Sequence, residues 1–233
     1  MKPVYTAVLP PDTAPPQGTE LVLFSDTRPY LSESLASEML RRAARYAKKY
    51  GVYLVPQRFL VHDCLCLCLV APNGKPVAAQ RATHLNVDYR ERHMQRVSAI
   101  VPFDTPLGRM ALLPDVDFCM PHAARQAACD GAEIIIASQF VQPYDYFEDN
   151  LRSTAESAAR SNGVPVVAAM SGYGIICRPD GETVFSPFED VPIAAAVTPC
   201  AMPESLRAGA AEARAVLISH SELFTTGGDT DAE

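Results

Sequence analysis

Residues 103–117, Phe-Asp-Thr-Pro-Leu-Gly-Arg-Met-Ala-Leu-Leu-Pro-Asp-Val-Asp, hold the most informative pattern in the chain. Arg109–Pro114 is apolar after its first residue, which is typical of a strand buried on both faces. The turn Thr105–Gly108, with its proline and glycine, joins this strand to an earlier strand-like run, Val97–Asp104. The pattern therefore predicts a sheet whose inner strand ends directly at an acidic segment.

Strands and helices alternate outward from this segment in both directions. Ser32–Tyr50 is the clearest helix, because apolar residues recur at helical spacing, Ser32 or Ser34 can cap its start and Gly51 can end it. We expect a further helix at Pro121–Cys129 and another at Asn150–Asn162. The expected strands are Glu20–Phe24, Val52–Pro56, Arg58–Val70, Pro76–Arg81, Ala132–Ala137, Val164–Ala169, Gly174–Arg178, Glu182–Phe185 and Ile193–Thr198. This alternation predicts a layered α/β fold.

No internal linker divides the 233 residues, so we expect one domain over residues 1–200. Residues 201–233 are rich in Ala, Ser and acidic side chains and are expected to form a C-terminal extension. Within it, Glu204–Ile218 is expected to form a helix and Thr225–Glu233 a loose tail.

The charge balance of the chain argues against nucleic acid and anionic membranes as partners. Twenty Lys and Arg residues stand against 27 Asp and Glu residues, which gives a net charge of −7. A surface for nucleic acid or for an anionic membrane would need a basic stripe. The one basic cluster, within residues 41–49, has helical spacing and is interpreted as a solvated helix face. We therefore expect neither nucleic acid nor a membrane as a partner.

The seven cysteines, an odd number, follow no secretory signal pattern, which indicates buried thiols in a reducing cytoplasm. No apolar stretch reaches the roughly 18 residues of a membrane span. Three of the cysteines alternate at Cys64, Cys66 and Cys68, so a strand would place them on one face about 7 Å apart. That spacing is too wide for one tetrahedral zinc ion, and we interpret them as small buried residues. No metal site is predicted.

Five segments, each a weak signal alone, occur in an order that resembles the carbon–nitrogen hydrolase (nitrilase) superfamily. They are Glu20–Asp26, Asn73–Leu85, Phe103–Asp117, Gly131–Ile136 and Ala169–Gly181. Together the five segments and the last expected strand cover about residues 20 to 198. The last of the five segments is most similar to the apolipoprotein N-acyltransferase branch of the superfamily.

The resemblance implies a four-layer α-β-β-α sandwich and a homodimer or higher homo-oligomer, with no cofactor. The N-terminus departs from the family pattern, because only Val4–Leu9 and a Pro-rich link precede the first of the five segments. We therefore expect a nitrilase-type fold that is truncated at the N-terminus and lacks the family's first helix.

The resemblance also implies a mechanism in which Glu is the general base, Lys stabilises the oxyanion and Cys is the nucleophile. These positions correspond here to Asp26, Ala82 and Asp115. Asp26 is one methylene too short, by roughly 1.5 Å, for proton transfer within a hydrogen bond. Ala82 offers the oxyanion neither charge nor donor, and Asp115 cannot form a thioester. All three catalytic roles are expected to be lost.

Neighbouring residues offer partial replacements. Cys119, four residues after Asp115, is an alternative nucleophile if His122 or Asp26 serves as its base, although a packed thiol is the simpler interpretation. Arg28 is a candidate counter-charge between the two carboxylates of Asp26 and Asp115, which would otherwise repel each other. His84 and Asp117 correspond to supporting residues of the family and are candidates for ligand binding.

Three functions follow from these residues. The first is a pseudoenzyme that keeps the nitrilase fold, binds a small molecule or a partner, and no longer hydrolyses amides or nitriles. The second is a diverged carbon–nitrogen hydrolase that uses a relocated nucleophile such as Cys119. The third is a structural subunit of a protein assembly. The sequence names no ligand, because specificity in a shared fold depends on the residues around its pocket.

Overall fold

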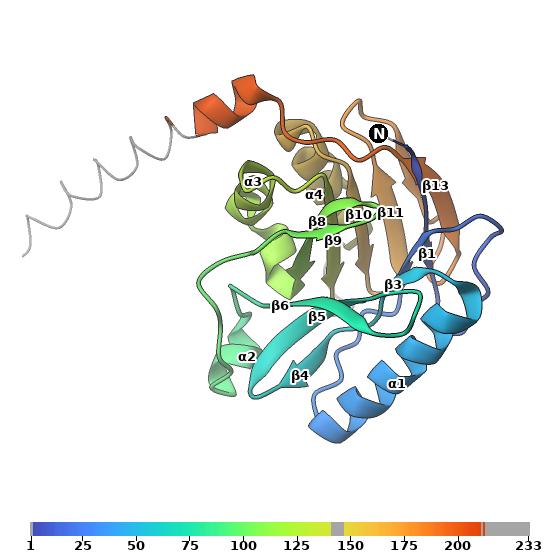
Figure 1. Ribbon diagram of the computed structural model, residues 1–233. Coiled ribbons are helices and arrows are strands. Elements are labelled where there is room, and N and C mark those ends of the chain that lie inside the picture. The colour runs from blue at the N-terminus through green and yellow to red at the C-terminus, as the bar shows by residue number, and fades with distance from the viewer. Residues whose placement is uncertain (1, 141–146, 211, 213–233) are drawn as a thin grey trace, which may run out of the picture.

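The computed structural model describes residues 2–140, 147–210 and 212 and contains two β-sheets (Figure 1). The first sheet has the strand order β13-β1-β2-β3-β5-β4, and β6 pairs with β5. β1, β2 and β3 run parallel, and the other pairs are antiparallel. The strands of this sheet are β1 (Val4–Leu9), β2 (Leu21–Phe24), β3 (Tyr53–Val55), β4 (Phe59–Val61), β5 (Cys64–Val70), β6 (Pro76–Arg81) and β13 (Ile193–Val197).

The second sheet has the order β12-β11-β10-β9-β8-β7, with β8, β9 and β10 parallel. Its strands are β7 (Phe103–Thr105), β8 (Gly108–Pro114), β9 (Ile134–Gln139), β10 (Val166–Met170), β11 (Tyr173–Cys177) and β12 (Thr183–Phe185). The helices are α1 (Glu33–Tyr50), α2 (Val87–Glu91), α3 (Pro121–Cys129) and α4 (Phe147–Asn162), and a 3₁₀ turn, η1, spans Asp115–Cys119.

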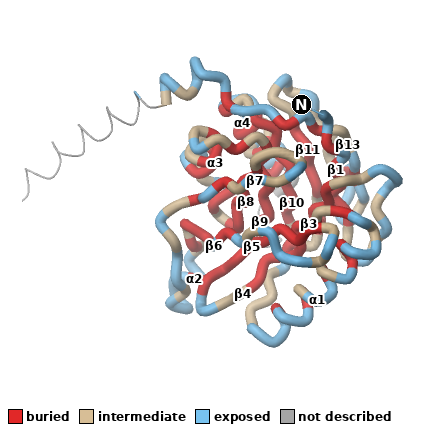
Figure 2. The backbone as a smooth tube through the Cα atoms, viewed as in Figure 1, coloured by how far each residue is buried: buried red, intermediate tan, exposed pale blue. Residues whose placement is uncertain are grey.

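Three hydrophobic clusters show that the elements form four layers. One cluster packs α1 against the outer face of the first sheet, and a second fills the space between the two sheets. The third packs α3 and α4 against the outer face of the second sheet. Figure 2 shows the buried strands at the centre of the molecule. The predicted α-β-β-α sandwich is therefore confirmed.

The helix α1 begins and ends where its sequence predicts. The Ser32 side chain accepts a hydrogen bond from the Leu35 amide, and Gly51 takes the left-handed conformation at the C-terminus with φ of 67°. The alternate cysteines Cys64, Cys66 and Cys68 lie on the face of β5 that packs in the cluster under α1. They are buried small side chains, as expected.

Two predicted strands are wrong in extent. The run Arg58–Val70 is a hairpin, because His62 and Asp63 both take positive φ values, 47° and 57°, and reverse the chain between β4 and β5. Neither residue is the glycine that usually marks such a turn. Only the end of the run Val97–Asp104 pairs with β8, as part of β7. The short helix α2 was not predicted.

Among the described residues, no helix separates β1 from β2, as expected from the Pro-rich link. At the other end, residues 204–210 are helical, whereas most of the remaining extension, including the predicted tail Thr225–Glu233, lies outside the described residues. No described helix is both long and apolar enough to cross a membrane.

The carboxyl ends of the parallel strands in both sheets meet at one edge of the sandwich. There the amide of Gly172, after β10, donates to the Ser25 carbonyl after β2 at 3.0 Å. The amide of Ser171 donates to Thr27 Oγ1 at 2.8 Å. Ligands of α/β folds bind outside this end of the strands. The edge therefore brings the segments after β2, β8 and β10 into one candidate site.

Candidate functional site

Asp115 is the first residue after β8 and has the backbone of a sharp elbow. Its φ is 55°, a left-handed conformation that is uncommon for any residue other than glycine, and the chain then enters η1. Its side chain is only 1% exposed. Strained positive-φ residues concentrate at functional sites, where the surrounding structure holds them in place. The elbow therefore points a carboxylate into the protein at the edge where the two sheets meet.

The partner of Asp115 is Arg58, which lies between β3 and β4. Its guanidinium is fully buried and donates through Nη1 to Asp115 Oδ1 and through Nη2 to the Thr27 carbonyl, at 2.7 Å to the latter. The side-chain amide nitrogen of Asn86, Nδ2, lies 3.5 Å from the other carboxylate oxygen, Asp115 Oδ2. Arg58 Nε is buried without a hydrogen-bond partner among the described atoms. One guanidinium therefore joins the segment after β2 to the elbow after β8.

Tyr89 of α2 is buried close to this ion pair. Burial raises the pKa of its phenol, and the charge of Asp115 adds to this effect while that of Arg58 opposes it. Tyr89 and Arg58 thus place an aromatic ring and a buried guanidinium beside the elbow. Asp115 is therefore almost unexposed and has one cation that compensates its charge.

Asp26 forms a separate ion pair with Arg28. Arg28 donates through its amide and Nε to Oδ1 and through Nη2 to Oδ2, at 3.0–3.1 Å. Burial alone would raise the pKa of Asp26, but these hydrogen bonds and the charge of Arg28, together with Gln57, lower it overall. The Arg28 side chain is 76% exposed. Asp26 is therefore an ionised carboxylate that a surface arginine holds in place.

The expectation that Arg28 bridges Asp26 and Asp115 is wrong. Each carboxylate has its own arginine, and the cation at Asp115 is Arg58. Sequence reasoning missed Arg58, which it took as the first residue of a long strand, because no local pattern marks a contact with Asp115, 57 residues further along the chain. Arg58 lies in the connection between β3 and β4, and its hydrogen bond to the Thr27 carbonyl holds it at the edge where the sheets meet.

Ala82 follows β6 and is 0% exposed. It packs in a small apolar cluster with Leu65, Leu85 and Tyr89. Its amide donates to the Leu65 carbonyl at 2.8 Å, and its carbonyl accepts from the Val97 amide at 3.1 Å. The backbone of Ala82 is therefore fully engaged, and its side chain contributes an apolar wall.

Asp117 is fully buried and organises the segment after Ala82. Oδ1 accepts from Thr83 Oγ1 at 2.6 Å, from the His84 amide at 2.8 Å and from His84 Nδ1 at 2.7 Å. Oδ2 accepts from the Thr83 amide at 2.8 Å. Asp117 therefore fixes the position and the tautomer of His84.

Cys119 has no base among its hydrogen-bond partners. Its thiol donates to Gln139 Oε1 at 3.0 Å, and burial of the sulfur raises the pKa of the thiol although the residue as a whole is exposed. His122, one of the two expected bases, instead pairs with His84 through Nε2 atoms 3.1 Å apart, and Asp26 pairs with Arg28. The predicted pairing of Cys119 with either base is therefore absent from the described structure.

Metal ligands do not gather in the part of the chain that the structure describes. No group of three or more His, Cys, Asp or Glu side chains has the geometry to hold a metal ion there. In chemical terms the site holds a buried carboxylate neutralised by a buried arginine, a second carboxylate paired with an exposed arginine, and the buried apolar side chain of Ala82.

Comparison with known proteins identifies the fold. The family model for carbon–nitrogen hydrolase matches residues 13–189. A carbon–nitrogen hydrolase from Helicobacter pylori G27 is 17% identical, with a TM-score of 0.71, over 84% of this chain and 89% of that one. A mutant of the amidase from Nesterenkonia sp. AN1, with acrylamide added to its active-site cysteine, is 15% identical, with a TM-score of 0.70, over 92% and 99% of the two chains. The search of curated proteins found no match.

Proposed function

The chain belongs to the carbon–nitrogen hydrolase family, and on that premise we propose that it is a pseudoenzyme, which keeps the amidase-like fold but no longer hydrolyses amides or nitriles. In this proposal Asp26, Ala82 and Asp115 occupy the positions of the family's Glu, Lys and Cys. The fold then serves to bind a small molecule or a partner.

The observation that carries the proposal is the buried ion pair between Arg58 and Asp115. Amide hydrolysis through a covalent intermediate needs a nucleophile with a free pair of electrons facing the substrate carbonyl. The Asp115 carboxylate instead accepts a hydrogen bond from a guanidinium that is itself fully buried. Attack by this carboxylate would have to break the pair and leave the Arg58 guanidinium without its partner in the protein interior, which costs several kcal/mol.

The other two positions support the same conclusion. A tetrahedral intermediate needs a donor or a cation at its oxyanion, and the methyl group of Ala82 provides neither. Asp26 keeps a carboxylate, but Arg28 engages both of its oxygens and holds its pKa below the ordinary range. A base with a lowered pKa is a poor acceptor for a proton at neutral pH.

The test is a search for turnover and for a covalent adduct. Purified protein is incubated with short aliphatic and aromatic amides and nitriles, and ammonia release and intact mass are measured. The proposal predicts no ammonia above the buffer control and no acyl adduct on the protein. Ammonia release that is lost in Asp115→Asn or in Cys119→Ser, but kept in the control Cys200→Ser, would refute it.

A diverged hydrolase that uses Cys119 is the second candidate. Cys119 and Pro121 line a cavity of about 220 Å³ together with Ser153, Thr154 and Ser157 of α4, which gives the thiol a place to meet a ligand. The raised pKa of the thiol and its bond to Gln139 argue against a reactive nucleophile. The Cys119→Ser and Cys200→Ser pair above distinguishes the two candidates.

Two finer expectations belong to the same proposal. The first is a relationship to the apolipoprotein N-acyltransferase branch of the family, which rests on the sequence of residues Ala169–Gly181. A homodimer or a larger assembly that includes this chain as a structural subunit would be detected by native mass spectrometry, with and without cell extract.

A further inference from the structure

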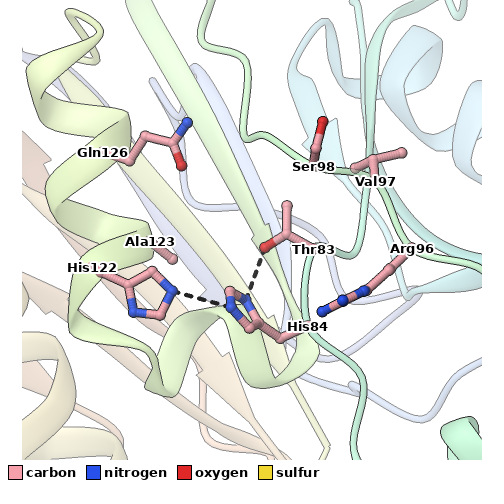
Figure 3. A pocket seen from close by; sticks show the side chains of 8 residues that line it. All are labelled: Thr83, His84, Arg96, Val97, Ser98, His122, Ala123 and Gln126. Atoms are coloured by element: carbon pink, nitrogen blue, oxygen red, sulfur yellow. Dashed lines mark hydrogen bonds between the residues drawn. The ribbon is translucent and has the colours of Figure 1, made fainter. Parts of the chain in front are cut away.

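A cavity of about 400 Å³ lies beside the Asp117 network, outside the Arg58–Asp115 pair. Three segments that are distant in the sequence form its walls: residues 83–84 after β6, residues 96–98 before β7, and the first turns of α3 (Figure 3). The lining residues are Thr83, His84, Arg96, Val97, Ser98, His122, Ala123 and Gln126. The volume accommodates a small metabolite-sized molecule.

The side chains that line this cavity are mostly polar, and none of them is acidic. Six of the eight residues carry polar side chains. Thr83 and His84 donate to Asp117 and His122 donates to His84, which leaves Arg96, Ser98 and Gln126 as the side-chain donors available to a ligand. None of the eight is acidic, in a chain whose net charge is −7. His122 and Ala123 are the second and third residues of α3, so the cavity also lies at the positive end of that helix. A cavity with donors and no carboxylate favours an anion.

Arg96 supplies the fixed charge. It is exposed, and no carboxylate lies within ion-pair distance of it among the described residues. In Figure 3 its guanidinium extends toward His84 at the mouth of the cavity. An arginine without a protein partner presents a planar fork of donors that matches the two oxygens of a carboxylate or phosphate.

The imidazoles of His84 and His122 form the opposite wall. Asp117 holds Nδ1 of His84, so its Nε2 accepts the hydrogen bond that His122 Nε2 donates across 3.1 Å (Figure 3). The two rings meet edge to face with centroids 4.8 Å apart. The buried carboxylate behind His84 therefore fixes both rings toward the cavity.

Two nitrogens 3.1 Å apart also match the separation of two imidazole ligands on one zinc ion, for which Zn–N is about 2.0–2.1 Å. Two observations favour the anion over the metal. The described residues provide no third metal ligand, and the cation Arg96 faces the same space. A divalent cation would meet repulsion from Arg96, whereas an oxyanion would meet attraction.

We propose that this cavity is a ligand site for an oxyanion, a phosphate or carboxylate group carried by a small molecule, with Arg96 as its principal charge partner. None of Asp26, Ala82 and Asp115 lines the cavity, so the proposal does not depend on whether the chain has lost hydrolysis. The proposal gives the His84–Asp117 pair a role in binding: His84 lines the wall of the cavity, and Asp117 holds His84 in place.

The test measures binding of inorganic phosphate and of succinate by isothermal titration calorimetry at about 150 mM salt. The variants are Arg96→Gln, His122→Gln and the control Arg92→Gln, which removes the same charge from an exposed arginine outside the cavity lining. We expect saturable binding of at least one of the two anions. Loss of one charge-assisted contact corresponds to about a tenfold weaker affinity in Arg96→Gln, with Arg92→Gln within about twofold of the parent.

The stronger binder of the two identifies the anionic group. Three results would overturn the proposal: no saturable binding of either anion, equal weakening in Arg92→Gln and Arg96→Gln, or binding that Arg96→Gln leaves unchanged. A titration with Zn²⁺ tests whether the cavity binds a metal ion instead of an anion. Zinc binding that disappears in His122→Gln, in a protein that binds neither anion, would assign a metal site instead.

Discussion

The guanidinium of Arg58 and the carboxylate of Asp115 form an ion pair in which both side chains are buried, 0% and 1% exposed, although the residues are 57 positions apart in the sequence. The pair lies at the elbow after β8, where the chain takes a left-handed conformation. A buried pair is costly to form and costly to break from one side only. Its presence constrains both the stability and the chemistry of this edge of the fold.

Removal of both partners is expected to destabilise the protein by less than the sum of the two single removals. Arg58→Met leaves Asp115 buried without its cation, and we expect a loss of about 3–5 kcal/mol in the free energy of unfolding. Asp115→Asn, chosen because Asn tolerates the positive φ, is expected to cost about 2–4 kcal/mol. The double variant should lose less than the sum of the two by at least about 2 kcal/mol, as measured by urea unfolding. Additive losses would show that the two side chains do not stabilise each other.

The Asp26–Arg28 pair predicts a small, pH-dependent contribution to stability. Because the pKa of Asp26 is lowered in the folded protein, the contribution is present above its ordinary value of 3.8 and is lost as the pH falls through the folded value below that. Arg28 is mostly exposed, so Arg28→Gln is expected to cost less than about 1 kcal/mol at pH 7. The difference from the parent should shrink on acidification below about pH 4. Thermal unfolding at pH 7, 5 and 3 checks this, and a difference that grows at low pH would contradict it.

The sequence predicted those features that depend on nearby residues. Helix α1 was predicted because Ser32 and Gly51, which define its ends, are adjacent to it in the chain. The strand β8 and its elbow followed from a continuous apolar run that ends at acidic residues. The alternation of strands and helices predicted a layered α/β fold, and the resemblance to the carbon–nitrogen hydrolase superfamily implied its four layers; the family model matches residues 13–189.

The candidate site was predicted less well, because its contacts join distant segments. Arg58 reaches Asp115 over 57 residues. Asp117 reaches Thr83 over 34 residues, and His122 reaches His84 over 38. No periodicity or local propensity encodes such pairings, so the sequence identified several of these residues individually without their partners.

The thiols are expected to differ widely in reactivity. Burial raises the pKa of Cys66 to about 11, of Cys68 to about 12 and of Cys177 to about 11, so all three should resist alkylation in the folded protein. Cys119 should react slowly at pH 7.5, because its pKa is also raised, and faster as the pH increases. Exposed Cys200 should react first. Iodoacetamide labelling followed by peptide mass spectrometry measures the order, and labelling of Cys119 ahead of Cys200 would favour the diverged hydrolase.

If Asp26, Ala82 and Asp115 hold the family's catalytic positions, as proposed, restoration of its three residues should fail unless Arg58 is also replaced. The triple change Asp26→Glu, Ala82→Lys and Asp115→Cys places a lysine at a fully buried position and removes the carboxylate that neutralises Arg58. Two buried cations would then face one thiol, and an unpaired buried charge alone costs about 3–5 kcal/mol. The added change Arg58→Met removes one cation and leaves the introduced lysine as the only one. We expect the quadruple variant to be the more stable of the two and to form an acyl adduct with a reactive ester, which intact mass would detect. An adduct that forms equally fast in the triple variant would show that Arg58 does not close the site, and no adduct in either variant would show that the pocket has closed for another reason.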